Sequence, residues 1–236
     1  QGVAELPLQQ RPPLLLPVLE HEIRAVRVAV GRALAGVAAQ QLPARARAAL
    51  ERAFVEVEQS FGVSASWAET HVERSVFELA RGRLTEAKHA LETALRLQPC
   101  HVEAYLNLAD LQRQRGDEAA AERALRAALE CNPQFAAAHH ALGLWQVRRG
   151  QPKAALASLQ RAVELAPADA RFSYVLAVAL AGRGERDEAI RVLERAIEHH
   201  PSDVGALRAL TGYLSEAGQR ERALETRRKL DKLLGE

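Results

Sequence analysis

The 236-residue chain is poor in aromatic residues, which make up 4% of it, and it contains two cysteines and no methionine. Sheet sandwiches and barrels rely on aromatic and β-branched side chains, so the scarcity of aromatics beside abundant alanine and leucine favours closely packed helices. Apolar residues recur at intervals of three and four, as in Leu142, Trp145, Ala155, Leu156 and Leu159, rather than at two. The sequence therefore predicts an all-α fold.

Long apolar runs are absent too. The longest, residues 14–19 with Pro17 inside and residues 174–181, fall short of the roughly 20 residues that a membrane helix needs. Neither a signal peptide nor a starting methionine is seen, so we expect a processed product or a part of a longer protein. The 32 basic and 30 acidic residues give a net charge of +2 and are interleaved, which offers nucleic acid no broad positive field. We therefore expect neither membrane insertion nor a nucleic-acid partner.

A strict period organises most of the chain. Prolines, glycines, alanines and leucines each recur every 34 residues, and a fixed interval of this length is typical of stacked helical hairpins. The series are Pro99, Pro133, Pro167 and Pro201; Gly82, Gly116, Gly150, Gly184 and Gly218; Ala87, Ala121, Ala155, Ala189 and Ala223; and Leu91, Leu125, Leu159 and Leu193.

Each period predicts a helix, a tight turn at the glycine, a second helix and a proline at which that helix ends. Two helices that cross closely need small residues on both sides. The alanine series supplies one side, and the first helices supply the other with Ser75, Ala109, Gly143, Ala177 and Thr211.

On these residues the chain resembles the tetratricopeptide repeat family, most clearly in YLNLADLQRQRGDEAAAERALRAALECNP from Tyr105 and HHALGLWQVRRGQPKAALASLQRAVELAP from His139. The resemblance implies a right-handed α-solenoid of helical hairpins over residues 68–236. We expect five units: a degenerate one at 68–101, then 102–135, 136–169 and 170–203, and a capping one at 204–236. The first departs from the family at Arg74 and Glu78, where large core residues are usual, and the last at Arg227, which replaces the periodic leucine.

Residues 1–67 do not follow the period. Two apolar helical runs meet near residues 20–22, and the segment resembles a HEAT-type pair, with Val26 and Arg27 in its second helix. A third, bridging helix is predicted at residues 44–61, after Pro43. Because one such pair cannot bury its own apolar surface, we expect it to pack on the bridging helix and on the first repeat.

The order of these parts, with RAALERAF in the bridging helix, resembles the C-terminal solenoid of bacterial multihaem c-type cytochromes. This resemblance implies an alternative function, the docking region of an electron-transfer protein, and a periplasmic or secreted location. The chain has no CxxCH haem-attachment motif, so haem would have to lie upstream or in a partner chain.

Nothing in the sequence predicts catalysis, a metal site or a cofactor of this chain. The adjacent histidines His139/His140 and His199/His200 diverge by about 100° on a helix and cannot easily share an ion. We place His139 in a hairpin core and His140 on the open face. No nucleophile has a partner at a recognisable spacing, and the glycines are explained by turns. Cys100 and Cys131 fall at the same end of one predicted hairpin; a disulfide stays open, and two partly buried free thiols are favoured.

The resemblance also implies a binding groove along the first helices of the units. Residues at offsets of three and four share one stripe of a helix, and they turn away from the second helix of the same unit. An apolar centre with arginines and an acid at its flanks suits a peptide or helix of a protein partner, with Tyr174 as an anchor. A stripe that packs only within the solenoid, or that mediates self-association, stays open. The predicted groove residues are Leu106, Asp110, Arg113, His140, Leu144, Val147, Arg148, Arg171, Tyr174, Val178 and Arg208.

Chaperone-tail recognition, used by a subgroup of the family, is not expected here. That subgroup holds a C-terminal carboxylate with lysines and asparagines, and of these only Asn107 is matched. Val72, Val76, Ala137 and Ala141 stand where its other polar residues would be.

Overall fold

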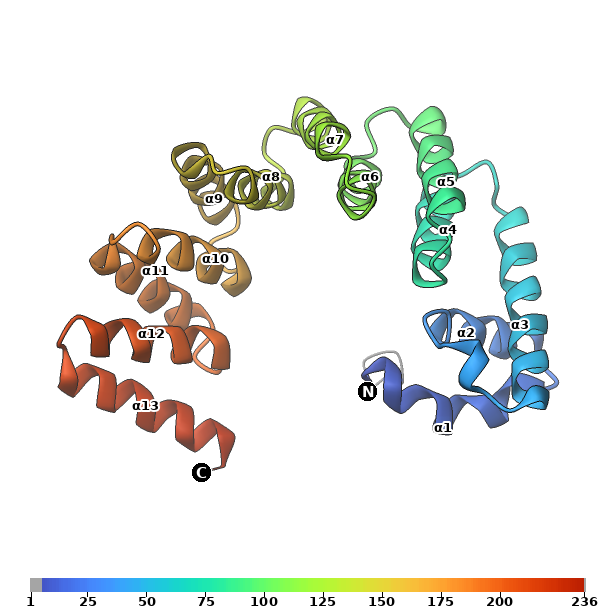
Figure 1. The fold of residues 1–236 in the computed structure, drawn as a ribbon, viewed down its shortest axis with the longest axis horizontal. Helices are drawn as coiled ribbons and strands as arrows, with labels where there is room; N and C mark the ends of the chain where they lie inside the picture. The colour runs from blue at the N-terminus through green and yellow to red at the C-terminus, as the bar shows by residue number, and fades with distance from the viewer. Residues whose placement is uncertain (1–5, 236) are drawn as a thin grey trace. The chain divides into compact units, whose positions relative to one another are not determined.

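The computed structural model of the chain describes residues 6–235, and the regular elements within them are α-helices and short 3-10 helices (Figure 1). The prediction of an all-α fold is confirmed. Residues 1–5, at the start of the predicted N-terminal segment, and residue 236, at the end of the predicted capping unit, lie outside the described residues. The chain forms two compact units, unit 1 over Gln1–Ala124 and unit 2 over Leu125–Glu236.

Unit 1 begins with short helical segments and continues with longer helices. Its core gathers Leu34, Leu50, Phe54, Val57 and Phe77, all at most 5% exposed. The elements are η2 (Leu8–Gln10), α1 (Arg11–Leu15), η3 (Leu16–Glu20), α2 (Arg24–Ala33), η4 (Ala39–Gln41), α3 (Ala44–Gly62), α4 (Ala68–Ala80), α5 (Leu84–Leu97), α6 (Val102–Gln114) and the first half of α7 (Glu118–Cys131).

The leading run of the expected HEAT-type pair is three short segments rather than one helix. A proline opens both α1 and η3, because proline is tolerated in a first turn and disrupts a helix interior. The second run, α2, packs on α3, as predicted. The Arg27 Nη2 donates to Glu56 Oε1 over 2.8 Å and ties the two helices together. Phe77 brings α4 into the same core through an edge contact with Phe54, whose ring centroid lies 5.6 Å away.

The departures at the first repeat, Arg74 and Glu78, belong to a charged cluster around the buried Glu78 carboxylate. Glu78 is 1% exposed. Burial raises the pKa of its carboxyl, although Arg83, Arg81 and Arg74 each lower it. The Arg81 guanidinium lies over the rings of Phe54 and Phe77, 4.4 and 5.1 Å from their centroids. Charged side chains therefore fill the space where the repeat pattern usually has large apolar ones.

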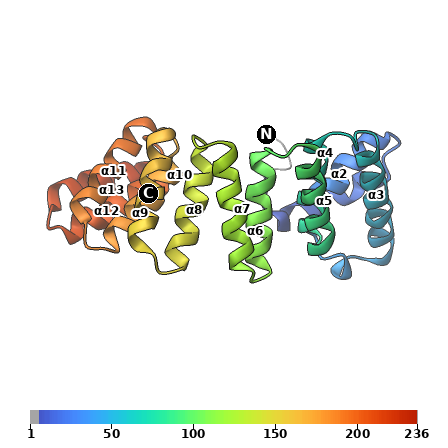
Figure 2. The same ribbon diagram turned by 90° about the horizontal axis from the view of Figure 1, so that it is seen from above.

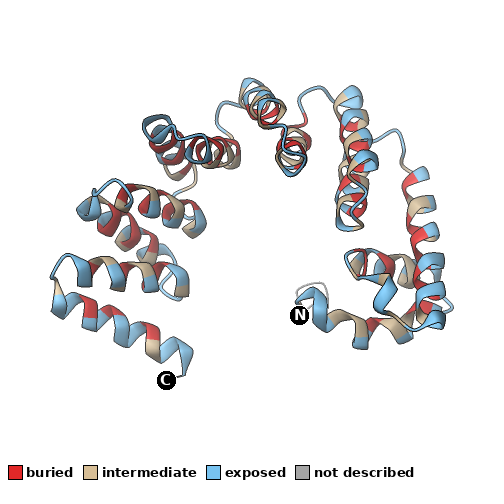
Figure 3. Ribbon diagram, viewed as in Figure 1, coloured by how far each residue is buried: buried red, intermediate tan, exposed pale blue. Residues whose placement is uncertain are grey.

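Unit 2 contains the rest of α7 and three hairpins: α8 (Ala136–Arg148) with α9 (Pro152–Leu165), α10 (Ala170–Ala181) with α11 (Arg186–His199), and α12 (Val204–Glu216) with α13 (Arg220–Leu234). Successive hairpins pack side by side through α9 with α10 and α11 with α12 (Figure 2). The buried residues face the neighbouring helices, while the outer faces are exposed (Figure 3). Ala155, Ala189, Leu159 and Leu193 are all at most 1% exposed, and the last unit's Arg227 faces solvent.

Each predicted turn glycine has a positive φ, between 67° and 83°. Gly184 has φ 83°, and the turn closes with the Glu185 amide donating to the carbonyl of Leu180 over 3.0 Å. The prolines stand two residues beyond the ends of α5, α7, α9 and α11. The turn and stop signals of the sequence are therefore confirmed.

A matched pair of glycines in one turn tests this backbone requirement. Gly184→Ala should lower the free energy of unfolding by about 1 kcal/mol or more, because an L side chain is strained at positive φ. Gly182, two residues earlier, has φ −61°, so Gly182→Ala should be neutral or stabilise by up to about 1 kcal/mol. Thermal melting followed by circular dichroism should shift in opposite directions, and equal shifts would contradict the turn assignment.

Both cysteines, Cys100 and Cys131, are disulfide-bonded, and none of the described residues is a free cysteine. The favoured interpretation, two partly buried free thiols, is therefore wrong. The structure has the disulfide that the sequence analysis left open as the alternative.

Candidate functional site

The candidate site is an apolar cleft in unit 2, between α8, the start of α9 and α10. Its volume is about 680 Å³. We call it the α8–α10 cleft, and it is lined by Leu144, Val147, Gly150, Pro152, Ala155, Leu156, Tyr174, Val175, Val178, Ala179, Gly182 and Arg183.

Three large apolar side chains of the cleft are open to solvent. Val147 is 49% exposed, Tyr174 40% and Val178 43%. Tyr174 and Val178 lie one turn apart on α10, and Val147 lies near the end of α8. Because these residues meet at one cavity rather than being scattered singly, they are typical of a surface that a partner covers.

Helix phase explains why these side chains stay outside the core. Leu176, Ala177 and Leu180 on α10 are at most 4% exposed and belong to the core with α9 and α11. At 100° per residue, the mean direction of Tyr174 and Val178 lies about 130° around the helix from that of the three core residues, which turns them away from the core. The two stripes of α10 therefore hold the hairpins together on one side and line the cleft on the other.

The cleft has one cation in its lining, Arg183, whose Nε donates to Glu185 Oε1 over 2.8 Å. On α12, Tyr213 is half-buried, and burial together with Tyr174 and Glu216 raises the pKa of its phenol. The arrangement offers apolar contact and hydrogen bonding, and it brings together no acid–base pair.

The structure brings four predicted residues together in this cleft: Leu144, Val147, Tyr174 and Val178. The predicted arginines Arg148, Arg171 and Arg208 are exposed in unit 2 and do not line it. Leu106, Asp110 and Arg113 belong to α6 of unit 1, and His140 lies on α8 of unit 2 outside the cleft lining. On α6, Leu106 is half-buried, and the Arg113 Nε donates to the exposed Asp110 Oδ1 over 3.1 Å.

His140 does not lie on the open face. It is 7% exposed, because the ring of Phe172 at the start of α10 covers it with 4.6 Å between centroids. Burial lowers the pKa of His140, and Arg171 acts in the same direction. The expected positions of the two histidines are reversed, since His139 is only half-buried and its Nε2 lies 2.9 Å from the Pro133 carbonyl oxygen.

The sequence pattern missed one wall of the cleft. Gly150, Pro152, Ala155 and Leu156 come from the turn and the second helix of the hairpin, and Arg183 comes from the next turn. A stripe along the first helices contains none of them. Pro152 at the first turn of α9 was the available signal, because it marks where that helix begins beside the stripe.

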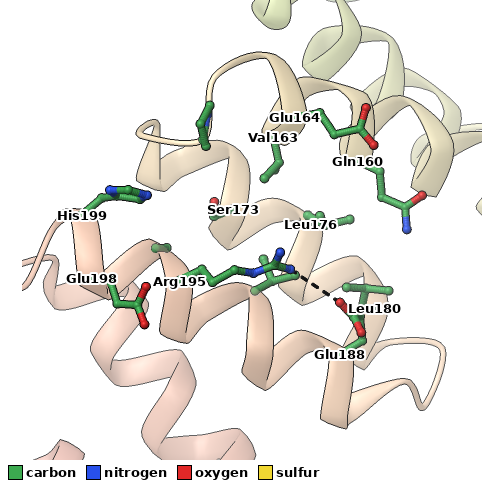
Figure 4. Close-up of a pocket in the computed structure, with 13 residues that line it drawn as sticks. Gln160, Val163, Glu164, Ser173, Leu176, Leu180, Glu188, Arg195, Glu198 and His199 are labelled. Carbon is green, nitrogen blue, oxygen red and sulfur yellow. Dashed lines mark ion pairs between the residues drawn. The ribbon is translucent and has the colours of Figure 1, made fainter.

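A second cavity of about 490 Å³ lies between α9 and α11, above α10 (Figure 4). Its floor includes Leu176, Leu180 and the buried Ser173, and Arg195 reaches towards Glu188 with 3.7 Å between Nη2 and Oε1. A cavity of about 580 Å³ recurs one repeat later between α11 and α13. Many of its residues are the 34-residue counterparts of the first set, as in Val163 and Ile197, Pro167 and Pro201, and Leu180 and Leu214.

The recurrence indicates that these cavities arise from the regular stacking of second helices. The α8–α10 cleft differs because its lining is mostly apolar and includes exposed large side chains. Among residues 6–235, no group of three or more histidine, cysteine or acidic side chains is placed to hold a metal ion. In the same part of the chain, every helix is too short or too polar to cross a membrane.

Comparison with known proteins identifies the repeat. The family model described as tetratricopeptide repeat matches residues 78–144 and 146–214. No curated protein matches the chain.

Many solved structures are similar to it in fold, among them the following three. A crystal structure of MamA protein has 23% identity and a TM-score of 0.59, over 70% of this chain and 91% of that one. MamA 41-end from Desulfovibrio magneticus RS-1 has 25% identity and a TM-score of 0.58, over 70% and 94%. YrrB, described as a TPR protein with an unusual peptide-binding site, has 24% identity and a TM-score of 0.55, over 75% and 91%. At such low identities these likenesses show the fold.

Proposed function

The chain belongs to the tetratricopeptide repeat family, and from this premise we propose that it is a non-enzymatic scaffold that binds a peptide or helix of a protein partner in the α8–α10 cleft. The observation that carries the proposal is the convergence of exposed Val147, Tyr174 and Val178 on one apolar cavity. Exposed apolar side chains of this size cost solubility, and a partner that covers them gains their burial free energy.

The dimensions of the cleft suit a side chain or two of a polypeptide. Its volume of about 680 Å³ falls within the range of roughly 300–1,000 Å³ typical of ligand sites. Tyr174 can act as the anchor, because a tyrosine combines a large apolar ring with a hydroxyl that hydrogen-bonds at low entropic cost. The positions on α8 and α10 are rigid, since the opposite faces of both helices are buried in the hairpin cores.

Selection of displayed random peptides on the full chain tests this proposal. Enriched peptides, resynthesised and titrated by fluorescence anisotropy, should bind Tyr174→Ala roughly tenfold more weakly, as expected for the loss of one aromatic anchor worth about 1–2 kcal/mol. Adding Arg171→Glu and Arg208→Glu should weaken binding further. Helical content and melting should stay unchanged, because all three side chains are exposed.

Arg161→Glu with Glu194→Arg is the matched control on the second helices, α9 and α11. These changes should leave peptide binding intact. If the control variant loses the peptides and the Tyr174 variants keep them, the chain binds through its second helices and the cleft assignment is wrong.

The alternative from the sequence, a docking region of a multihaem cytochrome, stays a prediction. None of the described contacts favours it over a general scaffold. An absorbance spectrum of the protein purified from its natural source would decide between them, because covalently attached haem shows a Soret band.

A further inference from the structure

The charges of the first helices in unit 2 are one-sided. α8 and α10 contain no acidic residue, and α12 contains only Glu216, which accepts from the Arg186 Nε over 2.9 Å. The same helices carry Arg148, Arg171 and Arg208, and Arg149 follows directly after α8. Asp169 and Asp203 cap α10 and α12 at their N-termini, so within these helices the charged side chains are mostly positive.

Several of these arginines have no partner. Within the described residues, the side chains of Arg148, Arg149 and Arg208 form no ion pair or hydrogen bond, and all three residues are exposed. Arg171 lies 3.9 Å from its nearest acid, Asp169, which itself caps α10 by accepting from two backbone amides. On α9 and α11 the pattern is different, since exposed arginines there pair locally, Arg161 with Glu164 and Arg191 with Glu188.

Two of the unpaired cations lie next to the lining of the α8–α10 cleft in the sequence. Arg148 and Arg149 follow Val147, which lines the cleft. Arg183 lines the cleft from the turn after α10, but it is paired with Glu185. Arg171 precedes Tyr174 by one turn of the same helix. Apolar side chains in the centre with unpaired cations at the border complement a segment that carries an apolar side chain between carboxylates.

Resting on the proposed function, we propose that the occupant of the α8–α10 cleft is an acidic internal segment of a protein partner, with a bulky apolar side chain in the cavity and carboxylates facing Arg148 and Arg149. A second copy of this chain is the poorer occupant. A two-fold contact between two such faces would set arginines against arginines. Recognition of a chain terminus is not required, because the cations border a side-chain cavity.

Each exposed carboxylate–arginine pair is worth up to about fivefold in affinity, the equivalent of about 1 kcal/mol, and it weakens with salt. Two such pairs, at Arg148 and Arg149, should therefore raise the affinity for the segment by about tenfold or more at low ionic strength. The apolar contact at Tyr174 is insensitive to salt by comparison, so the two contributions separate in one titration series.

The probes are the peptides enriched by display, synthesised with amidated C-termini, together with versions in which every Asp and Glu is replaced by Asn or Gln. The acidic peptides should bind wild type about tenfold more tightly than their amide versions at low salt, and the gap should shrink at high salt. The Arg148→Glu, Arg149→Glu double variant should bind the acidic peptides about tenfold more weakly than wild type does at low salt. The amide peptides should hardly distinguish that variant from wild type.

A charge-matched control on α13 separates local contacts from general attraction. Arg228 and Lys232 are exposed and form no ion pair within the described residues. Arg228→Glu with Lys232→Glu changes the net charge by the same amount as the Arg148/Arg149 variant. This control should keep acidic-peptide binding within about twofold.

Two results would overturn the inference: amide peptides that bind as tightly as the acidic ones, or equal losses in the Arg148/Arg149 and Arg228/Lys232 variants. In either case, if the proposed function holds, Tyr174→Ala would still weaken peptide binding. If the enriched peptides instead bind the Tyr174→Ala variant as tightly as wild type, the proposed function itself is wrong. If an acidic peptide binds only when it is phosphorylated, the recognised group is phosphate rather than carboxylate, and the carboxylate assignment is wrong.

Discussion

Arg81→Ala is expected to lower the free energy of opening of unit 1 by about 3 kcal/mol or more, the cost of removing one partner from a buried ion cluster. The Arg81 side chain is 8% exposed, and its Nη1 donates to Glu58 Oε1 over 2.6 Å. Its guanidinium also stacks on the rings of Phe54 and Phe77. Alanine would remove the cation, open a space between the two rings and leave Glu78 buried with less compensation.

Arg83→Ala is the matched comparison, because Arg83 contacts the same Glu58 Oε1 at 3.0 Å and lies 3.6 Å from Glu78 Oε2, but its side chain is 42% exposed. Its loss should cost less than about 1 kcal/mol, as is usual for exposed pairs. Hydrogen exchange followed by mass spectrometry over residues 44–80 measures both variants. Equal effects would show that burial of the guanidinium is unimportant.

The cost of Arg81→Ala should also depend on pH. Burial raises the native pKa of Glu78 above its ordinary value of 4.5, so the native state holds this proton more tightly than the unfolded state does. The carboxyl therefore destabilises the fold increasingly as the pH rises from 4.5 through the native pKa. A protonated Glu78 needs no cation beside it, so the variant should lose less stability near pH 4.5 than near neutrality.

Gly143→Ala is expected to destabilise unit 2 by about 1–3 kcal/mol, the usual cost of overpacking a core. A Cβ at this position would lie 2.7 Å from Leu159 Cγ and 3.3 Å from the Ala155 carbonyl oxygen. Leu159 is fully buried and cannot move away without disturbing the α8–α9 crossing. The small residue is therefore required by the closeness of the two helices, as the periodic pattern of small residues predicts.

Gly212→Ala on α12 provides the opposite case within the same unit. Nothing lies within 4 Å of a Cβ added there, and Gly212 is exposed inside a helix. Alanine should stabilise the helix by about 0.5–1 kcal/mol, because it loses less conformational freedom than glycine. Urea unfolding should therefore move in opposite directions for the two variants. A stabilising Gly143→Ala would contradict the close crossing.

The predictions that succeeded depend on local rules. A glycine 17 residues before a proline marks a turn because positive φ favours glycine at a helix end, and the proline marks a stop because it lacks an amide hydrogen. Ala155 and Leu159 lie on the buried side because a helix repeats every 3.6 residues. The stripe of Val147, Tyr174 and Val178 was predicted from the same periodicity; these residues line one cavity, and their role in binding stays a prediction.

The predictions that failed depend on neighbours. The periodicity assigned His140 to an exposed side of its own helix, but it contained no sign that Phe172 of the next hairpin covers that side. It also treated Cys100 and Cys131 as small apolar residues, because pairing of thiols is decided by their distance in space and not by their spacing.

The sequence by itself therefore determined the repeat, its turns, the helix faces and the all-α fold, since these follow from backbone chemistry within about 34 residues. Only the tertiary structure decided which faces are covered. It closed one wall of the α8–α10 cleft with Pro152 and Ala155 from a second helix, and it buried Arg81 between two aromatic rings. The physical reason is that a residue's direction on its helix is a local property, whereas its exposure depends on side chains distant in sequence.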